Sequence, residues 1–110
     1  MKPYFRKNKL KEILYSLLQH IHLPILSGQL RGKKWIVGSG GKIIRFLTTT
    51  YERRLTHMSQ IYIKEGDVVF DIGAHVGYFT LLFSVLVGNN GKVYSFEPNK
   101  RNFEILKKTH

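Results

Sequence analysis

The stretch that most constrains the fold is residues 67–77, where an apolar run ends in an acid and opens into a turn with two spaced glycines. It reads D-V-V-F-D-I-G-A-H-V-G, and residues 78–87 after it are almost entirely apolar. The β-branched and aromatic residues at 68–70, bounded by turn formers, predict a short strand buried on both faces. The apolar run that follows predicts a helix packed between layers. A strand, a glycine turn and a helix in this order form the first half of a βαβ nucleotide-binding unit.

A second strand is predicted at residues 93–96, and a helix is expected to start around Pro98, which suits a first-turn position. Phe103 and Leu106 would face inward from that helix. Glu97 then stands at the C-terminal end of the second strand. In open α/β sheets ligands bind at this edge, where an acid can accept both hydroxyls of a ribose. The alternative is that Glu97 only caps the helix, but its pairing with the acid and glycines of the first turn favours ribose binding.

Charge is distributed unevenly along the 110 residues, and the first part carries the whole net charge of +11. Residues 1–64 hold 13 Lys and Arg against Glu12 and Glu52, whereas residues 65–110 hold five bases and five acids. A basic arm is expected to face an anionic partner such as nucleic acid, a lipid head group or a phosphorylated substrate. Aromatic residues and cations are not interleaved on a recognisable platform, so no specific nucleic-acid partner is predicted.

The absence of cysteine excludes disulfides and thiolate metal ligands, which fits a reducing cytosol. The longest uncharged apolar run, residues 76–88, is too short to span a bilayer, which needs roughly 20 residues. No metal site is predicted, because His20 and His22 lie on different faces of a helix with no further ligand near in sequence. We therefore expect a cytoplasmic protein without a transmembrane segment.

An amphipathic helix is predicted near the N-terminus, where six apolar residues recur at spacings of three and four: Leu10, Ile13, Leu14, Leu17, Leu18 and Ile21. The helix should stop before Pro24. Lysines crowd its first turns, where the helix dipole favours anions, so helix stability alone does not account for them. The favoured interpretation is a helix docked on the core with a solvated basic face, and the alternative is peripheral contact of residues 5–22 with a membrane. Residues 1–32 are assigned to this helix and its connector.

The remaining residues, 33–110, are assigned to the start of a second unit, which opens with a β-hairpin. Its strands are predicted at residues 34–37 and 43–47. The Gly-rich turn at 38–42 is interpreted as a plain turn, because no Gly-Lys-Ser/Thr sequence follows and the loop joins a strand to a strand rather than to a helix.

A helix is expected after the hairpin, with Thr50 as its N-cap, Glu52 in its first turn and Gly66 as its C-terminal cap. Capping is a structural account of Thr50 and Glu52. Tyr51 and Glu52 are placed alternatively in a cofactor pocket, since this segment leads directly into the glycine-turn strand.

Two classes of protein use such a βαβ unit in different ways: NAD(P)-dependent oxidoreductases and S-adenosylmethionine (SAM) methyltransferases. A pyrophosphate needs bare backbone at the middle glycine of G-x-G-x-x-G, but this chain has His75 there. SAM carries no phosphate, and its ammonium calls for an acid near the loop. Asp71 supplies that acid two residues before Gly73. The spacing D-x-G-x-x-x-G, which ends at Gly77, therefore favours SAM.

Several segments resemble the FkbM-type family of SAM-dependent methyltransferases. They are D-I-G-A-H-V-G-Y-F-T at 71–80, G-K-V-Y-S-F-E-P-N at 91–99, the pair Tyr51 and Glu52, and I-K-E-G-D at 63–67. The resemblance covers residues 50–110 well and the hairpin loosely, whereas residues 1–30 match nothing in it. His75 is a departure, because the family often has asparagine at this position.

The resemblance implies an α/β class I methyltransferase fold, Rossmann-like, with a mostly parallel sheet between helices. It further implies SAM as the cofactor and O-methylation of a hydroxyl on a sugar, a glycan or another small metabolite. The residues implied in cofactor binding are Asp71, Gly73, Ala74, His75 and Gly77 in the loop, Glu97 at the ribose, and Tyr51 and Glu52 beside the pocket. No residue is assigned as the catalytic base.

The predicted sheet is incomplete, because the chain supplies one βαβ unit whereas a doubly wound sheet usually has about five or more strands. We therefore expect the chain to be the N-terminal portion of a longer enzyme, able to bind SAM weakly and unable to transfer the methyl group alone. The alternatives are a fragment of an NAD(P)-binding oxidoreductase and a non-catalytic basic protein that binds RNA or a membrane surface.

Overall fold

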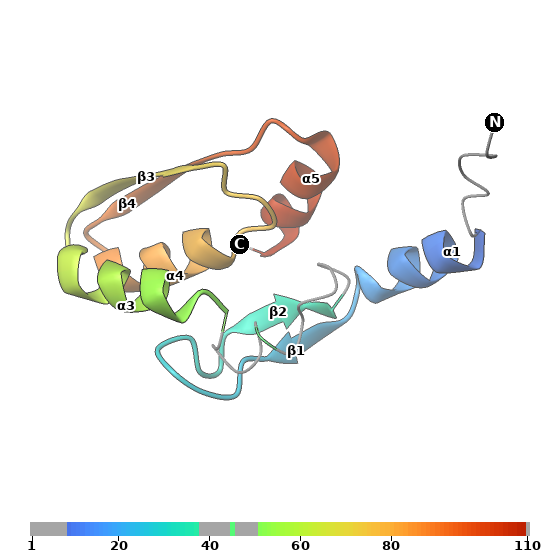
Figure 1. The fold of residues 1–110 in the computed structure, drawn as a ribbon, viewed down its shortest axis with the longest axis horizontal. Helices are drawn as coiled ribbons and strands as arrows, with labels where there is room; N and C mark the ends of the chain where they lie inside the picture. Colours follow the sequence, from blue (N-terminus) through green and yellow to red (C-terminus); the bar gives the residue numbers. More distant parts are fainter. Residues whose placement is uncertain (1–8, 38–44, 46–50, 110) are drawn as a thin grey trace.

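The computed structural model describes residues 9–37, 45 and 51–109, arranged as helices and short strands (Figure 1). The elements are α1 (Lys9–Leu18), β1 (His22–Pro24), β2 (Lys34–Ile36), α3 (Arg53–Tyr62), β3 (Val68–Ile72), α4 (Tyr78–Val87), β4 (Lys92–Phe96) and α5 (Lys100–Thr109). Among these residues β1 pairs with β2 antiparallel, and β3 pairs with β4 parallel. The mixed α/β class is as predicted.

The βαβ unit consists of β3, α4 and β4, close to the bounds that the sequence indicates. The parallel register places Asp71 beside Ser95, so the two strands end together. The Lys92 N–H donates to Asp67 O at 2.9 Å where the strands begin. Helix α4 packs against both strands, and its buried residues include Leu82, which is 1% exposed. The glycine loop therefore sits at the C-terminal edge of this parallel pair.

One face of the β3 and β4 pair is exposed, so the prediction of burial on both faces is wrong for the described residues. Val68, Phe70 and Ile72 alternate along β3, and each is more than half exposed. On β4, Tyr94 and Phe96 stack against the Phe70 ring at centroid distances of 5.4 and 6.1 Å. Alternation in a strand sends these side chains away from α4. In the part of the chain that the structure describes, α4 covers only the opposite face.

The N-terminal helix is shorter than predicted, because α1 ends at Leu18 and His22–Pro24 forms β1. This strand finds its partner in β2, with His22 opposite Ile36. The flanking bonds Val37 N–H to Ile21 O, at 2.9 Å, and Ile25 N–H to Lys33 O, at 2.8 Å, extend the ladder. Backbone pairing with a distant segment therefore overrides the local helical periodicity.

The predicted hairpin is only partly visible. Its first strand is β2, but the partner of β2 among the described residues is β1 rather than residues 43–47. Arg45 is helical, in place of the predicted strand, and the rest of the second strand and the turn at 38–42 lie outside the described residues.

Helix α3 begins later and ends earlier than the sequence predicts. It starts at Arg53 after Glu52, whose φ of 46° is left-handed and whose side chain makes no capping bond. Thr50, the predicted cap, lies outside the described residues. At the other end, the C-cap is Ile63 in extended conformation. Gly66 instead forms the turn into β3 with a φ of 88°.

The start of α5 is set by a side chain, because the Asn102 N–H donates to Asn99 Oδ1 at 3.1 Å. The helix begins at Lys100, two residues after the predicted start at Pro98. Leu106 is buried as predicted, but Phe103 is 39% exposed and Ile105 takes the inward position. Asn99 rather than Glu97 is therefore the residue that caps this helix.

The hydrophobic core lies between the β1 and β2 layer and helices α4 and α5. Trp35 is fully buried on β2, and its ring meets Tyr78 of α4 edge to face, with centroids 5.9 Å apart. Ile25 and Leu30, which the sequence places in a connector, are each 1% exposed and belong to the same core. Ile105 joins the core from α5. The N-terminal segment therefore packs against α4 and forms part of the same core.

Candidate cofactor site

The loop between β3 and α4, residues 73–77, is held by backbone hydrogen bonds to β4 and within the loop itself. The N–H groups of Gly73 and Ala74 both donate to Phe96 O, at 2.9 and 3.0 Å. The Gly77 N–H donates to Ala74 O at 2.9 Å. Gly73 and Gly77 have φ values of 78° and 97°, a left-handed conformation that glycine adopts without steric cost. The two predicted glycines are therefore required by the turn itself, and Gly77 also serves as the N-cap of α4.

His75 has a φ of 53°, so a non-glycine residue occupies the left-handed region in the middle of the loop. Asparagine and histidine are among the side chains that tolerate this region. The His75 N–H donates to Glu97 Oε2 at 2.7 Å. In this structure His75 therefore acts through its backbone N–H, which binds Glu97. The chemistry of its imidazole did not indicate this role.

Glu97 ties the glycine loop to the start of α5. Its Oε2 accepts from the His75 N–H, and its Oε1 accepts from the Asn99 N–H at 2.8 Å. These bonds favour the ionised form, so they lower the pKa of Glu97; the Asn99 N–H has the largest effect and the His75 N–H a smaller one. A carboxylate has about four acceptor positions, so each oxygen keeps capacity for a ligand hydroxyl. The predicted ribose binding is compatible with this geometry, whereas support of the loop through the His75 N–H was not predicted from the sequence.

We expect Glu97→Gln to remove part of the dependence of stability on acidic pH. The folded pKa lies below the ordinary 4.5, so ionised Glu97 stabilises the fold above that pH, and this contribution is lost as the pH falls through the lower folded pKa. Thermal unfolding between about pH 3 and about pH 7 should show the gap between wild type and variant widest near neutrality and closing in acid.

The matched control is Glu104→Gln, which removes an exposed ion pair with Lys107 at 3.1 Å. Such pairs contribute little, so this variant should follow the wild-type profile. A gap between Glu97→Gln and wild type that stays constant at every pH would show that the Glu97 charge does not act through the two N–H bonds.

Asp71 is buried at the end of β3, where two hydroxyls fix its orientation. Thr80 Oγ1 on α4 donates to Asp71 Oδ2 at 2.6 Å, and Ser95 Oγ on β4 lies 2.8 Å from the same Thr80 oxygen. A hydroxyl has one proton to donate, so Ser95 donates to Thr80 and Thr80 to Asp71. Asp71 is 8% exposed. Sequence reasoning missed Thr80 and Ser95, although Ser95 is the register partner of Asp71.

Tyr51 and Glu52 enter the site from the start of α3, as the alternative interpretation of the sequence placed them. The Tyr51 ring lies edge to face on Tyr78, with centroids 5.1 Å apart, and 6.0 Å from Phe79. Burial raises the pKa of Tyr51, and the neighbouring Glu52 carboxylate raises it further. The phenol therefore keeps its proton at neutral pH.

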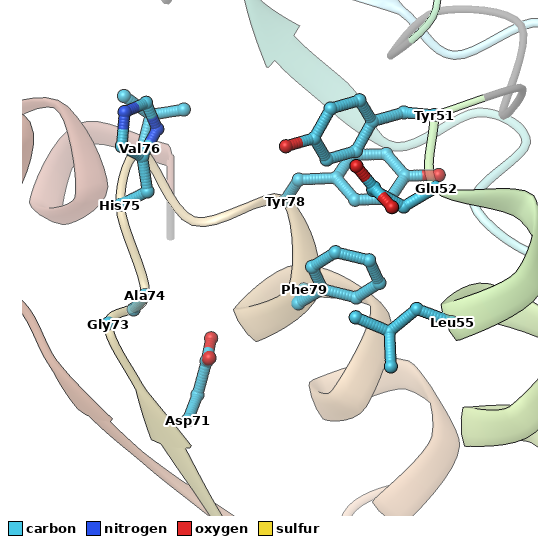
Figure 2. Close-up of a pocket in the computed structure, with 10 residues that line it drawn as sticks. All are labelled: Tyr51, Glu52, Leu55, Asp71, Gly73, Ala74, His75, Val76, Tyr78 and Phe79. Atoms are coloured by element: carbon cyan, nitrogen blue, oxygen red, sulfur yellow. The ribbon is translucent and has the colours of Figure 1, made fainter.

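These residues enclose a pocket of about 270 Å³ beside the loop (Figure 2). It is lined by Tyr51, Glu52, Leu55, Asp71, Gly73, Ala74, His75, Val76, Tyr78 and Phe79. Figure 2 shows Asp71 and the loop on one side and the rings of Tyr51, Tyr78 and Phe79 across from them. Most predicted site residues line this pocket, whereas Gly77 caps α4 and Glu97 braces the loop. The aromatic wall was missed, because Tyr78 and Phe79 read as ordinary helix core.

The curated proteins that are similar to this chain include two methyltransferases. The first, a probable cobalt-precorrin-6B C(15)-methyltransferase (decarboxylating) of Saccharolobus solfataricus, is 37% identical over 60 residues, which are 54% of this chain and 30% of that protein. The second, a protein-L-isoaspartate O-methyltransferase of Thermosipho melanesiensis, is 29% identical over 107 residues, which are 97% of this chain and 44% of that protein. No protein-family model and no solved structure matches the chain.

Both relatives are methyltransferases, and the chain spans less than half of the length of either one. The predicted relationship to methyltransferases that use SAM is therefore confirmed at the level of this broad class. Neither relative singles out the FkbM-type family.

Proposed function

We propose that the chain carries the SAM-binding part of a methyltransferase. The observation that carries this proposal is the bonding of the loop N–H groups. Those of Gly73, Ala74, His75 and Gly77 all donate to protein oxygens. A bound pyrophosphate would need such groups for its own oxygens. The geometry therefore supports a ligand without phosphate over the NAD(P) alternative.

The charges of the pocket suit the methionine part of SAM. The Asp71 carboxylate is fixed through Oδ2 by Thr80, which leaves Oδ1 to accept from the ligand ammonium. The Glu52 carboxylate lines the same pocket. A sulfonium beside the faces of Tyr51, Tyr78 and Phe79 would gain a cation–π interaction. Two acids and three rings in one small pocket thus favour a cationic ligand.

Glu97 is proposed to hold the ribose through the acceptor positions that its two N–H bonds leave. Gly73, Ala74 and Gly77 shape the loop around the methionine part without donating to it. The bound cofactor would supply an activated methyl group on sulfur. The residues described here bind and orient the donor, and alignment of donor with acceptor is the main contribution of the protein to such a transfer.

For the acceptor, we keep the proposal of a hydroxyl on a sugar or another small metabolite, and with it the FkbM-type assignment. It rests on the resemblance of residues 71–80 and 91–99 to that family. The two relatives differ in the acceptor that their names state, one being an O-methyltransferase and the other a C(15)-methyltransferase. The geometry of the pocket supports SAM as the methyl donor. The choice of acceptor rests on the resemblance alone.

Calorimetric titration of the full chain with S-adenosylhomocysteine tests the proposal. We expect saturable binding of one ligand per chain, with affinity in the micromolar range or weaker. NADH, titrated at the same concentrations, should give no saturable heat. Saturable NADH binding without S-adenosylhomocysteine binding would overturn the assignment of the pocket.

A further inference from the structure

Helix α1 presents an apolar stripe that nothing in the described part of the chain covers. Leu10, Ile13, Leu14 and Leu17 are 73%, 50%, 54% and 63% exposed. In Figure 1, α1 extends away from the rest of the molecule, beyond the β1 and β2 pair. The helix docked on the core, which the sequence favoured, is therefore not what the structure shows. Four large apolar side chains on one exposed stripe indicate a surface built for an apolar partner.

The stripe belongs to a strongly basic segment of the chain. Residues 1–37 contain eight Lys and Arg and a single acid, Glu12. Lys9 on α1 is exposed, and so are Arg31, Lys33 and Lys34 around β2. A second copy of this chain would bring a second cationic segment against the first, which disfavours self-association through α1. The charge instead calls for a partner that is anionic and apolar together.

We propose that α1 binds in the plane of an anionic lipid surface. A bilayer supplies both properties, since acyl chains receive the apolar stripe and acidic head groups attract the cations around it. A helix of ten residues is about 15 Å long, so it lies on the surface rather than crossing it. Within the residues that the structure describes, no helix is both long and apolar enough to cross a membrane.

Helix α1 is separate from the cofactor pocket, because none of the α1 side chains that the structure describes lines the pocket. The protein would then be held at a lipid surface through α1. The cofactor pocket lies elsewhere in the fold, between α3, β3 and α4. Leucines that are at least half exposed are not needed for the core, so they can be replaced without unfolding the protein.

The test is co-sedimentation of the full chain with vesicles of two compositions. One is phosphatidylcholine alone, and the other is an equal mixture of phosphatidylcholine and phosphatidylglycerol. We expect clear binding to the mixed vesicles, weaker binding to the neutral ones, and a fall with added salt. The double variant Leu14→Gln, Leu17→Gln should lose about tenfold or more in the partition coefficient, because the transfer of two leucine side chains is removed.

The matched control is Ser16→Gln, which places the same side chain at an exposed position of α1 off the stripe. It should bind within about twofold of wild type, since no buried apolar group is changed. Far-ultraviolet circular dichroism and thermal unfolding of each variant check that the fold persists. Equal binding by the double variant, or no binding to anionic vesicles, would overturn the proposal. So would a wild-type dimer in sedimentation velocity that the double variant dissolves, because the stripe would then hold a second copy.

Discussion

Asp71→Asn is expected to weaken binding of S-adenosylhomocysteine by roughly tenfold to a hundredfold, the range for loss of one charge-assisted hydrogen bond. The fold should survive, because an asparagine oxygen can still accept from Thr80 Oγ1, now 2.6 Å from Asp71 Oδ2. What is lost is the negative charge that faces the ligand ammonium. Calorimetric titration of wild type and variant measures the difference.

A ligand without the ammonium sharpens this prediction. Methylthioadenosine keeps the adenosine and lacks the amino-acid part, so its affinity should change by less than about twofold in Asp71→Asn. The matched control, Asp67→Asn, alters an acid that accepts from the Lys64 N–H in the turn before β3. It should leave both affinities unchanged. Equal losses for both ligands in Asp71→Asn would mean that Asp71 supports the pocket generally and does not bind the ammonium.

Trp35→Ala should cost about 3–5 kcal/mol in the free energy of unfolding, the range for truncating a buried aromatic residue. The side chain is fully buried and is the largest in the core. It joins β2 to Tyr78, whose ring in turn contacts Tyr51 in the pocket wall. Urea unfolding measures the loss, and a weaker S-adenosylhomocysteine affinity should accompany it.

Tyr62→Ala is the matched control for that experiment. This aromatic residue on α3 is 70% exposed, and surface substitutions of this kind usually change stability by less than about 0.5 kcal/mol. Similar losses in the two variants would contradict the placement of Trp35 at the centre of the core. The comparison also tests whether the N-terminal strands belong to the same cooperative unit as α4.

The βαβ unit could be predicted from the sequence because its signals are local. The apolar runs, the acid before the turn and the spaced glycines all lie within residues 67–99. The loop requires left-handed backbone at Gly73 and Gly77, and glycine is the residue that the pattern supplied there. Asp71 and Glu97 stand at strand ends, so their position followed from parallel pairing alone.

The other features of the fold and the site could not be predicted, because they depend on contacts between distant segments. Hydrophobic periodicity does not encode such contacts. Strand β1 forms because β2 offers backbone partners, although its residues continue a helical pattern. Thr80 and Ser95 meet Asp71 only when three elements come together. The use of the His75 N–H by Glu97 needs a bond across 22 residues. That bond and the neighbouring backbone bonds of the loop support the proposal of SAM over NAD(P), which the sequence had favoured because of the bulk of His75.

The measurement that tests the central claim most directly is a competition titration of the full chain loaded with S-adenosylhomocysteine. Added SAM should displace it from the pocket, because both ligands present the same ammonium and ribose to Asp71 and Glu97. Added NADH should not, because the loop N–H groups that a pyrophosphate needs already donate to protein oxygens. Displacement by NADH as effective as that by SAM would contradict the account.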